Sequence, residues 1–274
     1  MPKAAGLECE DRGEGDVIFM IHGGVFADAF APLSRCAQLA DDHRVIWYRR
    51  RGYGGSDPLT EPCGAADHAR DAAELLRELG VATAHVVGHS GGGAVAVRLA
   101  LDAPDLVHSL VLLEPAVFTE EDAVVVEELL QPLLDMYRSG QAGKAIHLFM
   151  RVAGGVDWKA DIEAHIPDAA AHAERDAAGL FDGDLARAHE TTYGPGDAER
   201  IHQPVLYLSG SKSGPQGVAV IRILAPHLRE AVVPDVNHSL HMVAPVQIAE
   251  MIADFIKEHP ISSASRPPQS PGRA

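Results

Sequence analysis

The sequence predicts an α/β fold, a mostly parallel twisted sheet with helices on both faces. Two observations support this prediction. Short apolar runs rich in β-branched or aromatic residues, typical of buried parallel strands, alternate with longer stretches of helical pattern. One such run leads through a glycine-flanked serine directly into an alanine-rich helical stretch, within residues 84–101. With 274 residues and 46% hydrophobic content, the chain can bury this core as one large domain.

Strands and helices are expected to alternate along most of the chain. The stretch 65–79 has helical spacing, with alanine and leucine residues near one face and Gly80 as a favourable C-cap. The apolar runs expected to form strands are 17–21, 45–48, 85–87, 109–113, 204–208 and 231–233. The alternation indicates parallel strands joined by helices that cover both faces of the sheet.

The alternation stops between Thr119 and about Arg200. This stretch has no strand pattern and contains EEDAVVVEELLQPLLDMYRSG, then an acidic alanine-rich segment and LARAHETTYG. It predicts helices, because long structureless loops are uncommon inside compact domains. The final segment, 261–274, is rich in Ser, Pro and Arg and is predicted to be disordered.

One motif points directly to chemistry. Gly88-His89-Ser90-Gly91-Gly92 follows an apolar strand and opens a helix. A sharp strand-to-helix turn forces close backbone approach and strained dihedral angles, which glycines permit. Such a nucleophile elbow exposes its serine hydroxyl, so Ser90 is the predicted nucleophile. The alternative is a purely structural Gly-Ser turn, because the bare G-x-S-x-G pattern also arises by chance.

At these residues the chain resembles the α/β-hydrolase superfamily, from about Leu7 to Ile256. The motifs that carry the resemblance are His22-Gly23-Gly24, Arg51-Gly52-Tyr53-Gly54-Gly55-Ser56, Gly88-His89-Ser90-Gly91-Gly92, and Asn237-His238 followed by Pro245. The resemblance implies an α/β-hydrolase fold with a serine nucleophile and a helical cap inserted after the sixth strand. It divides the chain into a core of 1–116 and 201–260, a cap of 117–200 and the tail. In the alternative, the inserted helices only add to the fold.

A serine hydroxyl becomes a good nucleophile only when a nearby base takes its proton. His238 is the predicted base, because it lies between the last apolar strand and the terminal helix, where the resembled fold delivers this residue. His241, three residues further on, is its rival. His89 is expected to pack beside the elbow.

The base in turn needs a carboxylate that holds its tautomer and stabilises the imidazolium. Many members of the resembled family carry this acid after the seventh strand, but residues 205–229 contain neither Asp nor Glu. Glu114 ends the apolar run 109–113, which corresponds to the sixth strand of the resembled fold, a position where some members carry their acid. Strand ends point into the site in open α/β sheets. Glu114 is therefore the predicted acid, and Asp235 is its rival.

Attack on a carbonyl creates an oxyanion, which needs aligned N–H donors. The amide of Gly91, at the start of the elbow helix, is expected to be one donor. The resemblance places the second donor in the loop after the strand 17–21. There Gly24 is the choice and Val25 the alternative, while His22 is expected to support the loop.

These residues predict a serine hydrolase that cleaves an ester, lactone or related acyl bond of a small, apolar molecule through an acyl-enzyme. An alkyl intermediate on serine would be a stable ether, so Ser90 disfavours the dehalogenase and epoxide hydrolase reactions of the resembled family. One alternative is a cyclase, lyase or rearrangement enzyme acting on a bulky natural product. Another is a non-catalytic member that only binds a ligand.

Composition limits the partners. The chain has 23 basic and 39 acidic residues, a formal net charge of −16, which disfavours nucleic acid. It has no apolar run of membrane-spanning length and no signal segment at its start, so a cytoplasmic location is expected. The expected partner is a small-molecule substrate, with no membrane partner; a homodimer is left open.

Cofactors and metals are not expected. Cys9, Cys36 and Cys63 are widely spaced and are expected to be reduced, structural thiols. His238 and His241 form the tightest histidine pair, but no third ligand is evident near them in the sequence. The predicted reaction needs only the side chains and amides named above.

Overall fold

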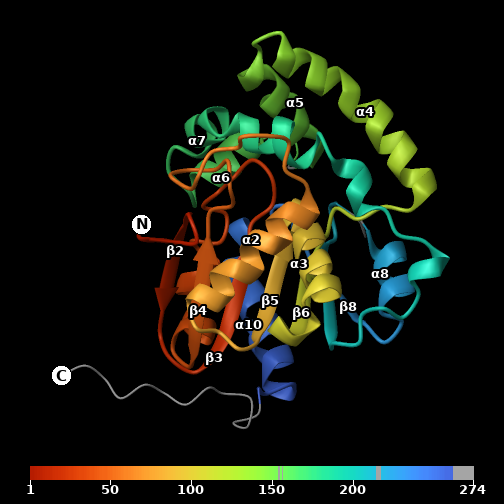
Figure 1. Ribbon diagram of the computed structural model, residues 1–274. Helices are drawn as coiled ribbons and strands as arrows, with labels where there is room; N and C mark the ends of the chain where they lie inside the picture. The colour runs from red at the N-terminus through yellow and green to blue at the C-terminus, as the bar shows by residue number, and fades with distance from the viewer. Residues whose placement is uncertain (154, 156, 214–216, 262–274) are drawn as a thin grey trace.

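One sheet forms the centre of the computed structural model, which describes residues 1–153, 155, 157–213 and 217–261. In this part of the chain eight strands pair in the order β1-β2-β4-β3-β5-β6-β7-β8 (Figure 1). They are β1 (Lys3–Ala4), β2 (Leu7–Arg12), β3 (Asp16–Ile21), β4 (His43–Tyr48), β5 (Ala84–His89), β6 (Val107–Leu113), β7 (Val205–Gly210) and β8 (Arg229–Val233). All neighbours from β4 to β8 pair in parallel, which confirms the predicted mostly parallel sheet.

Two antiparallel strands at one edge of the sheet were not predicted from the sequence. β1 pairs with β2, and β2 pairs with β4. The β2 sequence LECEDR alternates buried and half-buried side chains and ends in two exposed ones. A short edge strand with charged residues lacks the continuous apolar run by which the buried strands were recognised.

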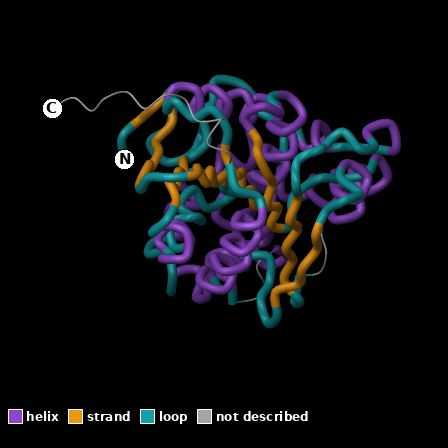
Figure 2. The backbone as a smooth tube through the Cα atoms, turned by 90° about the horizontal axis from the view of Figure 1, so that it is seen from below, coloured by secondary structure: helices purple, strands orange, loops and turns teal. Residues whose placement is uncertain are grey.

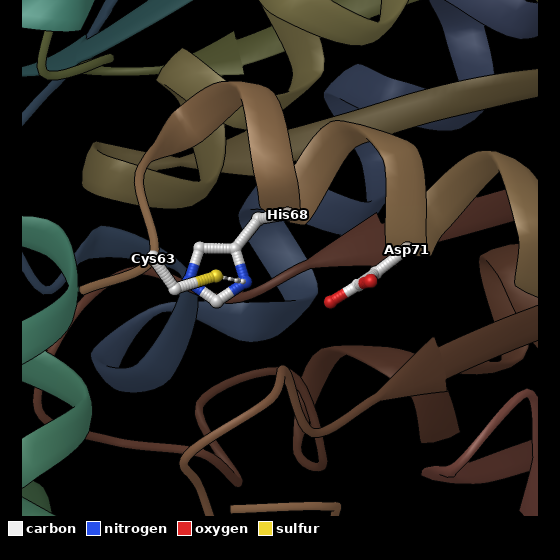
Figure 3. Close-up of side chains that lie close together, drawn as sticks. All are labelled: Cys63, His68 and Asp71. Atoms are coloured by element: carbon white, nitrogen blue, oxygen red, sulfur yellow. Dashed lines mark hydrogen bonds between the residues drawn. The ribbon is translucent and has the colours of Figure 1, made fainter. Parts of the chain in front are cut away.

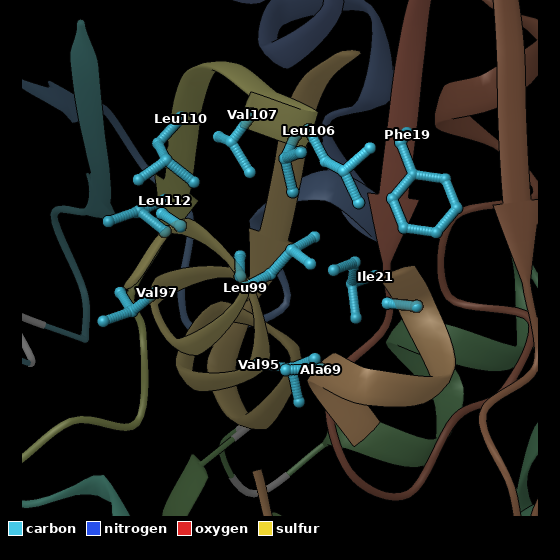
Figure 4. Close-up of a cluster of buried hydrophobic side chains, with 14 of the residues drawn as sticks. Phe19, Ile21, Ala69, Val95, Val97, Leu99, Leu106, Val107, Leu110 and Leu112 are labelled. Carbon is cyan, nitrogen blue, oxygen red and sulfur yellow. The ribbon is translucent and has the colours of Figure 1, made fainter. Parts of the chain in front are cut away.

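Helices cover both faces of the sheet, as Figure 2 shows from below. One face carries α2 (Ala65–Glu78), α3 (Ser90–Asp102) and α8 (Val218–Leu224), and the other carries α1 (Ala37–Ala40) and α10 (Pro245–Glu258). Successive strand residues serve the two faces in turn: Phe19 packs in the α2/α3 layer and Met20 in the α10 layer. Figure 4 shows the first of these layers, in which Leu99 of α3 lies among strand side chains.

A helical layer lies over the end of the sheet that includes the start of α3 (Figure 1). All of its elements fall between β6 and β7. η5 (Pro195–Asp197) falls in the same stretch but packs against α8. The elements of the layer are α4 (Glu120–Arg138), α5 (Ala142–Ala153), α6 (Trp158–Glu163), α7 (Ala169–Arg175), η3 (Gly179–Asp184) and η4 (Ala188–Thr191). The buried side chains of these helices form a third apolar cluster, which also includes Val25 and Phe26 from the loop after β3 and Met242 from the short helix after β8. This cluster attaches the inserted helices to the loops that surround the predicted nucleophile.

Short elements complete the fold. They are η1 (Leu33–Arg35), η2 (Pro104–Leu106) and α9 (Leu240–Val243). No helix among the described residues has the length and apolar character needed to cross a membrane. Residues 262–274 of the predicted disordered tail lie outside the described residues.

The packing of α10 generates a stability prediction. Ile252 is fully buried on this helix, whereas Val246 is 53% exposed. Ile252→Ala should lower the free energy of unfolding by about 2–5 kcal/mol, because it removes buried methyl groups and leaves a cavity. Val246→Ala, on the same helix, should change it by less than about 0.5 kcal/mol. Urea unfolding of both variants measures the difference, and equal losses would contradict this packing.

Candidate active site

Ser90 lies at the junction of β5 and α3 in a strained backbone conformation. Its φ is +51°, a region that residues with a side chain rarely adopt. The loop after β3 packs directly against this turn. A Cβ added to Gly23 would lie 2.8 Å from Nδ1 of His89 and 3.1 Å from Cβ of Ser90. Glycine is therefore required where the loop touches the elbow, and the Ser90 hydroxyl is left at the wall of a pocket.

The structure brings His238 and Glu114 together. Nδ1 of His238 lies 2.5 Å from Oε2 of Glu114, whose side chain is fully buried at the end of β6. A carboxylate only accepts hydrogen bonds, so Nδ1 donates its proton to Glu114 and Nε2 is left as the basic nitrogen of the neutral ring. His238 lines the same pocket as Ser90. The three residues are positioned by the ends of β5 and β6 and by the loop after β8.

The other oxygen of Glu114 is held by residues that the sequence analysis missed. Oε1 accepts hydrogen bonds from the backbone N–H of Gly210, at 2.7 Å, and from the hydroxyl of Ser213. Both donors belong to the end of β7 and the segment after it, where the absence of an acid was the observation that led to Glu114. This segment provides donors to a carboxylate on the neighbouring strand instead of providing the carboxylate itself.

The rival residues lie elsewhere. Asp235 is exposed, and its backbone N–H bonds the hydroxyl of Ser211. His241 is fully buried between the rings of Phe30 and His89, and neither of its ring nitrogens has a hydrogen-bond partner within the described chain. Burial, and secondarily the charge of His238, lower the pKa of His241 to about 3.

His89 packs beside the elbow, as predicted for it. Its Nε2–H donates to the backbone carbonyl of His238 at 2.9 Å, and its ring contacts the ring of His238 at a centroid distance of 4.6 Å. Burial is the main cause that holds the pKa of His89 well below the ordinary value. His89 is therefore a neutral ring, and its hydrogen bond supports the backbone of His238.

The two predicted oxyanion donors lie beside each other. A Cβ added to Gly91 would lie 3.7 Å from the backbone nitrogen of Gly24, and both glycines line the pocket with Ser90. Val25, the alternative donor, has a φ of +74° and packs in the apolar cluster of the helical layer. His22 donates from Nδ1 to the carbonyl of Gly23 at 2.6 Å and accepts at Nε2 from the backbone N–H of Arg50. His22 thus supports the loop.

A buried ion pair, which the sequence analysis also missed, adjoins this loop. Arg50 is fully buried and donates from Nη1 to Oδ1 of Asp184 at 2.6 Å and from Nη2 to Oδ2 at 2.8 Å. Nη2 also reaches the carbonyl of Gly23 at 3.0 Å, and the hydroxyl of Tyr53 donates to Oδ2 of Asp184. Asp184 ends η3, so this pair joins the helical layer to the sheet.

The pocket above Ser90 has a volume of about 490 Å³ and mostly apolar walls. α4 and α5 form much of its wall. Four large apolar side chains of these two helices line the pocket: Leu129, Leu133, Leu148 and Phe149. Met136, Met150 and Trp158 instead pack in the apolar cluster of the helical layer.

A second group of titratable residues lies on and just before α2. Cys63, His68 and Asp71 are buried and close together, with a contact between Sγ of Cys63 and Nδ1 of His68 (Figure 3). Both oxygens of Asp71 are bound by Arg51. Burial raises the pKa of Cys63 to about 12, and burial and the Arg50 charge lower that of His68 to about 3. The nearby guanidinium groups of Arg50 and Arg51 would repel a divalent cation here. We therefore interpret these three residues as part of the packed interior and not as a metal site.

Comparison with known proteins relates this chain to a family. A family model described as the alpha/beta hydrolase fold matches residues 16–150. The 2-(acetamidomethylene)succinate hydrolase of Mesorhizobium japonicum is 27% identical over 91% of this chain and 91% of its own length. A fluoroacetate dehalogenase of a Burkholderia species is 38% identical over 39% of this chain, but the match spans only 37% of that relative.

Solved structures agree on the fold. A thermophilic esterase from Thermogutta terrifontis superposes with a TM-score of 0.78 and covers 92% of this chain and 94% of its own, at 20% sequence identity. At that identity the likeness concerns the arrangement of strands and helices. It includes the helical layer, because so little of either chain is left unmatched.

The buried His241 generates a pH prediction. The folded protein keeps this ring neutral down to a pKa of about 3, whereas the unfolded chain takes up a proton near the ordinary value of 6.5. Between these values the unfolded state binds more protons, so acid destabilises the fold. His241→Phe should reduce the pH dependence of the unfolding free energy by up to about 1.4 kcal/mol per pH unit between pH 6 and 4. Urea unfolding across this range measures it, and an unchanged slope would contradict a neutral, buried His241.

Proposed function

Because the chain belongs to the α/β-hydrolase superfamily, we propose that it is a serine hydrolase cleaving an ester, lactone or related acyl bond through an acyl-enzyme. The observation that carries the proposal is the shared pocket of Ser90 and His238, with His238 bound through Nδ1 to the buried Glu114. This set of groups can activate a hydroxyl and stabilise the imidazolium that results.

In the first half of the reaction, Nε2 of His238 takes the proton of the Ser90 hydroxyl as Oγ attacks the substrate carbonyl carbon. The carbonyl oxygen becomes an oxyanion, which the amides of Gly24 and Gly91 stabilise by hydrogen bonds. His238 then gives its proton to the leaving alcohol, the bond to that oxygen breaks, and the acyl group stays on Ser90. Glu114 stabilises the positive charge that His238 carries between these two transfers.

In the second half, a water molecule takes the place of the alcohol. His238 removes one of its protons, the hydroxide oxygen attacks the acyl carbon, and the same two amides hold the second oxyanion. Collapse of this intermediate returns the proton through His238 to Ser90 and releases a carboxylic acid. No step needs a cofactor, and the expected partner is a small-molecule substrate alone.

The helical layer over the pocket is proposed to act as the cap. Residues 117–200 would form it, on a core made of residues 1–116 and 201–260. Support comes from the residues of α4 and α5 that line the pocket, among them Leu129 and Phe149. Apolar walls favour an apolar acyl or alcohol group.

The substrates in the relatives' names are not transferred to this chain. Displacement of fluoride from carbon by Ser90 would leave an ether, which water does not cleave under these conditions, so ester chemistry suits this nucleophile better. Fluoroacetate and a succinate derivative are carboxylates, and the described residues lining this pocket include neither Lys nor Arg. A neutral substrate is therefore the better match to the pocket walls.

Ser90 is tested by covalent labelling. Wild-type protein treated with a small fluorophosphonate should gain the mass of one adduct, and Ser90→Ala should gain none, because only an activated serine reacts. Ser139→Ala, at an exposed position, should label as the wild type does. Turnover of a short-chain ester should fall by several orders of magnitude in Ser90→Ala. Labelling that persists in Ser90→Ala would overturn the assignment.

In ¹⁸O-labelled water a hydrolase incorporates label into its acid product. A cyclase or lyase would turn over a substrate without that label, and a ligand-binding member would show no turnover. Either result would replace the proposed reaction.

Glu114 is tested against its rival. Glu114→Gln should lower kcat by on the order of 10³–10⁴-fold, because an amide neither holds the correct His238 tautomer nor stabilises the imidazolium. Asp235→Asn is the matched control and should leave kcat within about twofold, since this exposed side chain lies away from the ring. Steady-state kinetics of both variants decide the question. A large loss in Asp235→Asn with a small one in Glu114→Gln would reverse the assignment.

A further inference from the structure

One carboxylate lies in the wall of the pocket. Asp184 is the one carboxylate among the described residues that line the pocket, and no Lys or Arg accompanies it there. It comes from η3, whose Leu180 and Asp184 both lie against Gly24 in the loop after β3. A pocket with mostly apolar walls therefore presents a single negative group to a bound substrate.

This carboxylate lies beside the proposed oxyanion donors. Its Oδ2 would lie 3.4 Å from a Cβ added to Gly24 and 3.5 Å from one added to Gly91. These two glycines are adjacent to each other and to Ser90. Any acyl group whose carbonyl oxygen is held by their amides has its first few atoms close to Asp184.

The neighbours of Asp184 hold it as an anion. Burial alone would raise its pKa, but the charge of Arg50 and the hydrogen bonds from Arg50 and Tyr53 outweigh burial and lower the pKa. The side chain is 14% exposed and that of Arg50 is fully buried. The anion thus faces the pocket, and its counterion lies behind it.

Arg50 cannot itself bind a substrate carboxylate in this arrangement. Nη1 and Nη2 both donate to Asp184, and Nη2 also donates to the carbonyl of Gly23. A guanidinium binds a carboxylate through parallel hydrogen bonds, and here Asp184 already occupies them. If the negative charge of Asp184 were removed, a buried cation would remain next to the oxyanion donors.

We propose that Asp184 makes this site select uncharged acyl groups, and that it masks in Arg50 a latent binding site for substrate carboxylates. The proposal rests on the proposed function and names its substrate class. A substrate carboxylate near Asp184 meets like charge in a site of low dielectric, and it loses its hydration without gaining a donor. Asp184 is in this sense a specificity-determining residue, acting through repulsion as well as shape.

Two matched esters test the proposal. Ethyl levulinate and monoethyl succinate have acyl groups of nearly the same size, but the first ends in a neutral methyl ketone and the second in a carboxylate. In the wild type, kcat/KM for ethyl levulinate should exceed that for monoethyl succinate by on the order of 100-fold, measured as ethanol release. A ratio near one in the wild type overturns the proposal without any variant.

Variants assign the discrimination to Asp184. In Asp184→Asn the ratio should fall by about tenfold or more, because the unmasked Arg50 now favours the succinate ester. In the double variant Asp184→Asn with Arg50→Gln, that gain for the succinate ester should disappear. Asp71→Asn is the matched control: it also removes a buried carboxylate bound through two oxygens to an arginine, but outside the pocket, and should keep the wild-type ratio.

Fluorophosphonate labelling of Ser90 and a thermal melt of each variant accompany the kinetics. A folded, labelled Asp184→Asn protein that retains the wild-type ratio overturns the role of Asp184 and leaves the proposed function intact. If the wild type shows neither labelling nor turnover of either ester, the proposed function is overturned and this inference with it.

Discussion

The parallel register of the central strands is the constraint on which the site depends. Ile21 of β3 lies level with Gly88 of β5, and His89 of β5 lies level with Leu113 of β6. The residues that follow these strands therefore lie side by side, at the carboxyl ends of the strands. A shift of one strand by a single residue would turn its side chains to the opposite face and separate Ser90 from Glu114. The precision of the site is thus a property of the sheet ladder, not of any loop alone.

Three strained backbone positions lie at these strand ends. Val25, Ser90 and Glu114 each have a positive φ, at +74°, +51° and +45°, and each follows a strand of the sheet. Such conformations cost of order 1–3 kcal/mol each and persist only where the surroundings hold them. Here the holding contacts are apolar packing for Val25, the close approach of Gly23 for Ser90, and hydrogen bonds from Gly210 and Ser213 for Glu114. The fold tolerates these strained residues because they follow the strands of a well-packed sheet.

The sequence predicted those features that have a local signal. Apolar runs located the buried parallel strands, and glycine spacing located the turn at Ser90, because each depends on neighbouring residues. His238 and Glu114 were chosen by their places relative to strands, and the structure brings them into contact. Ser213 and Asp184 had no such signal: their partners Glu114 and Arg50 lie 99 and 134 residues away, and a polar residue in a loop looks the same with or without them. The edge strands β1 and β2 were missed because one-sided burial leaves no continuous apolar run.

The Arg50–Asp184 pair links attachment of the inserted helices to the chemistry of the pocket. A buried guanidinium without a partner is strongly unfavourable, so Arg50, in the loop after β4, requires Asp184 from the helical layer. The apolar cluster shared by these helices and the segments that follow the strands stabilises their contact, but apolar packing is not directional. The ion pair fixes one point of this contact through two hydrogen bonds. That point lies beside Gly24 and Gly91. Any displacement of η3 would therefore uncover a cation at the place where substrate charge matters most, so the position of the helices and the charge of the site cannot vary independently.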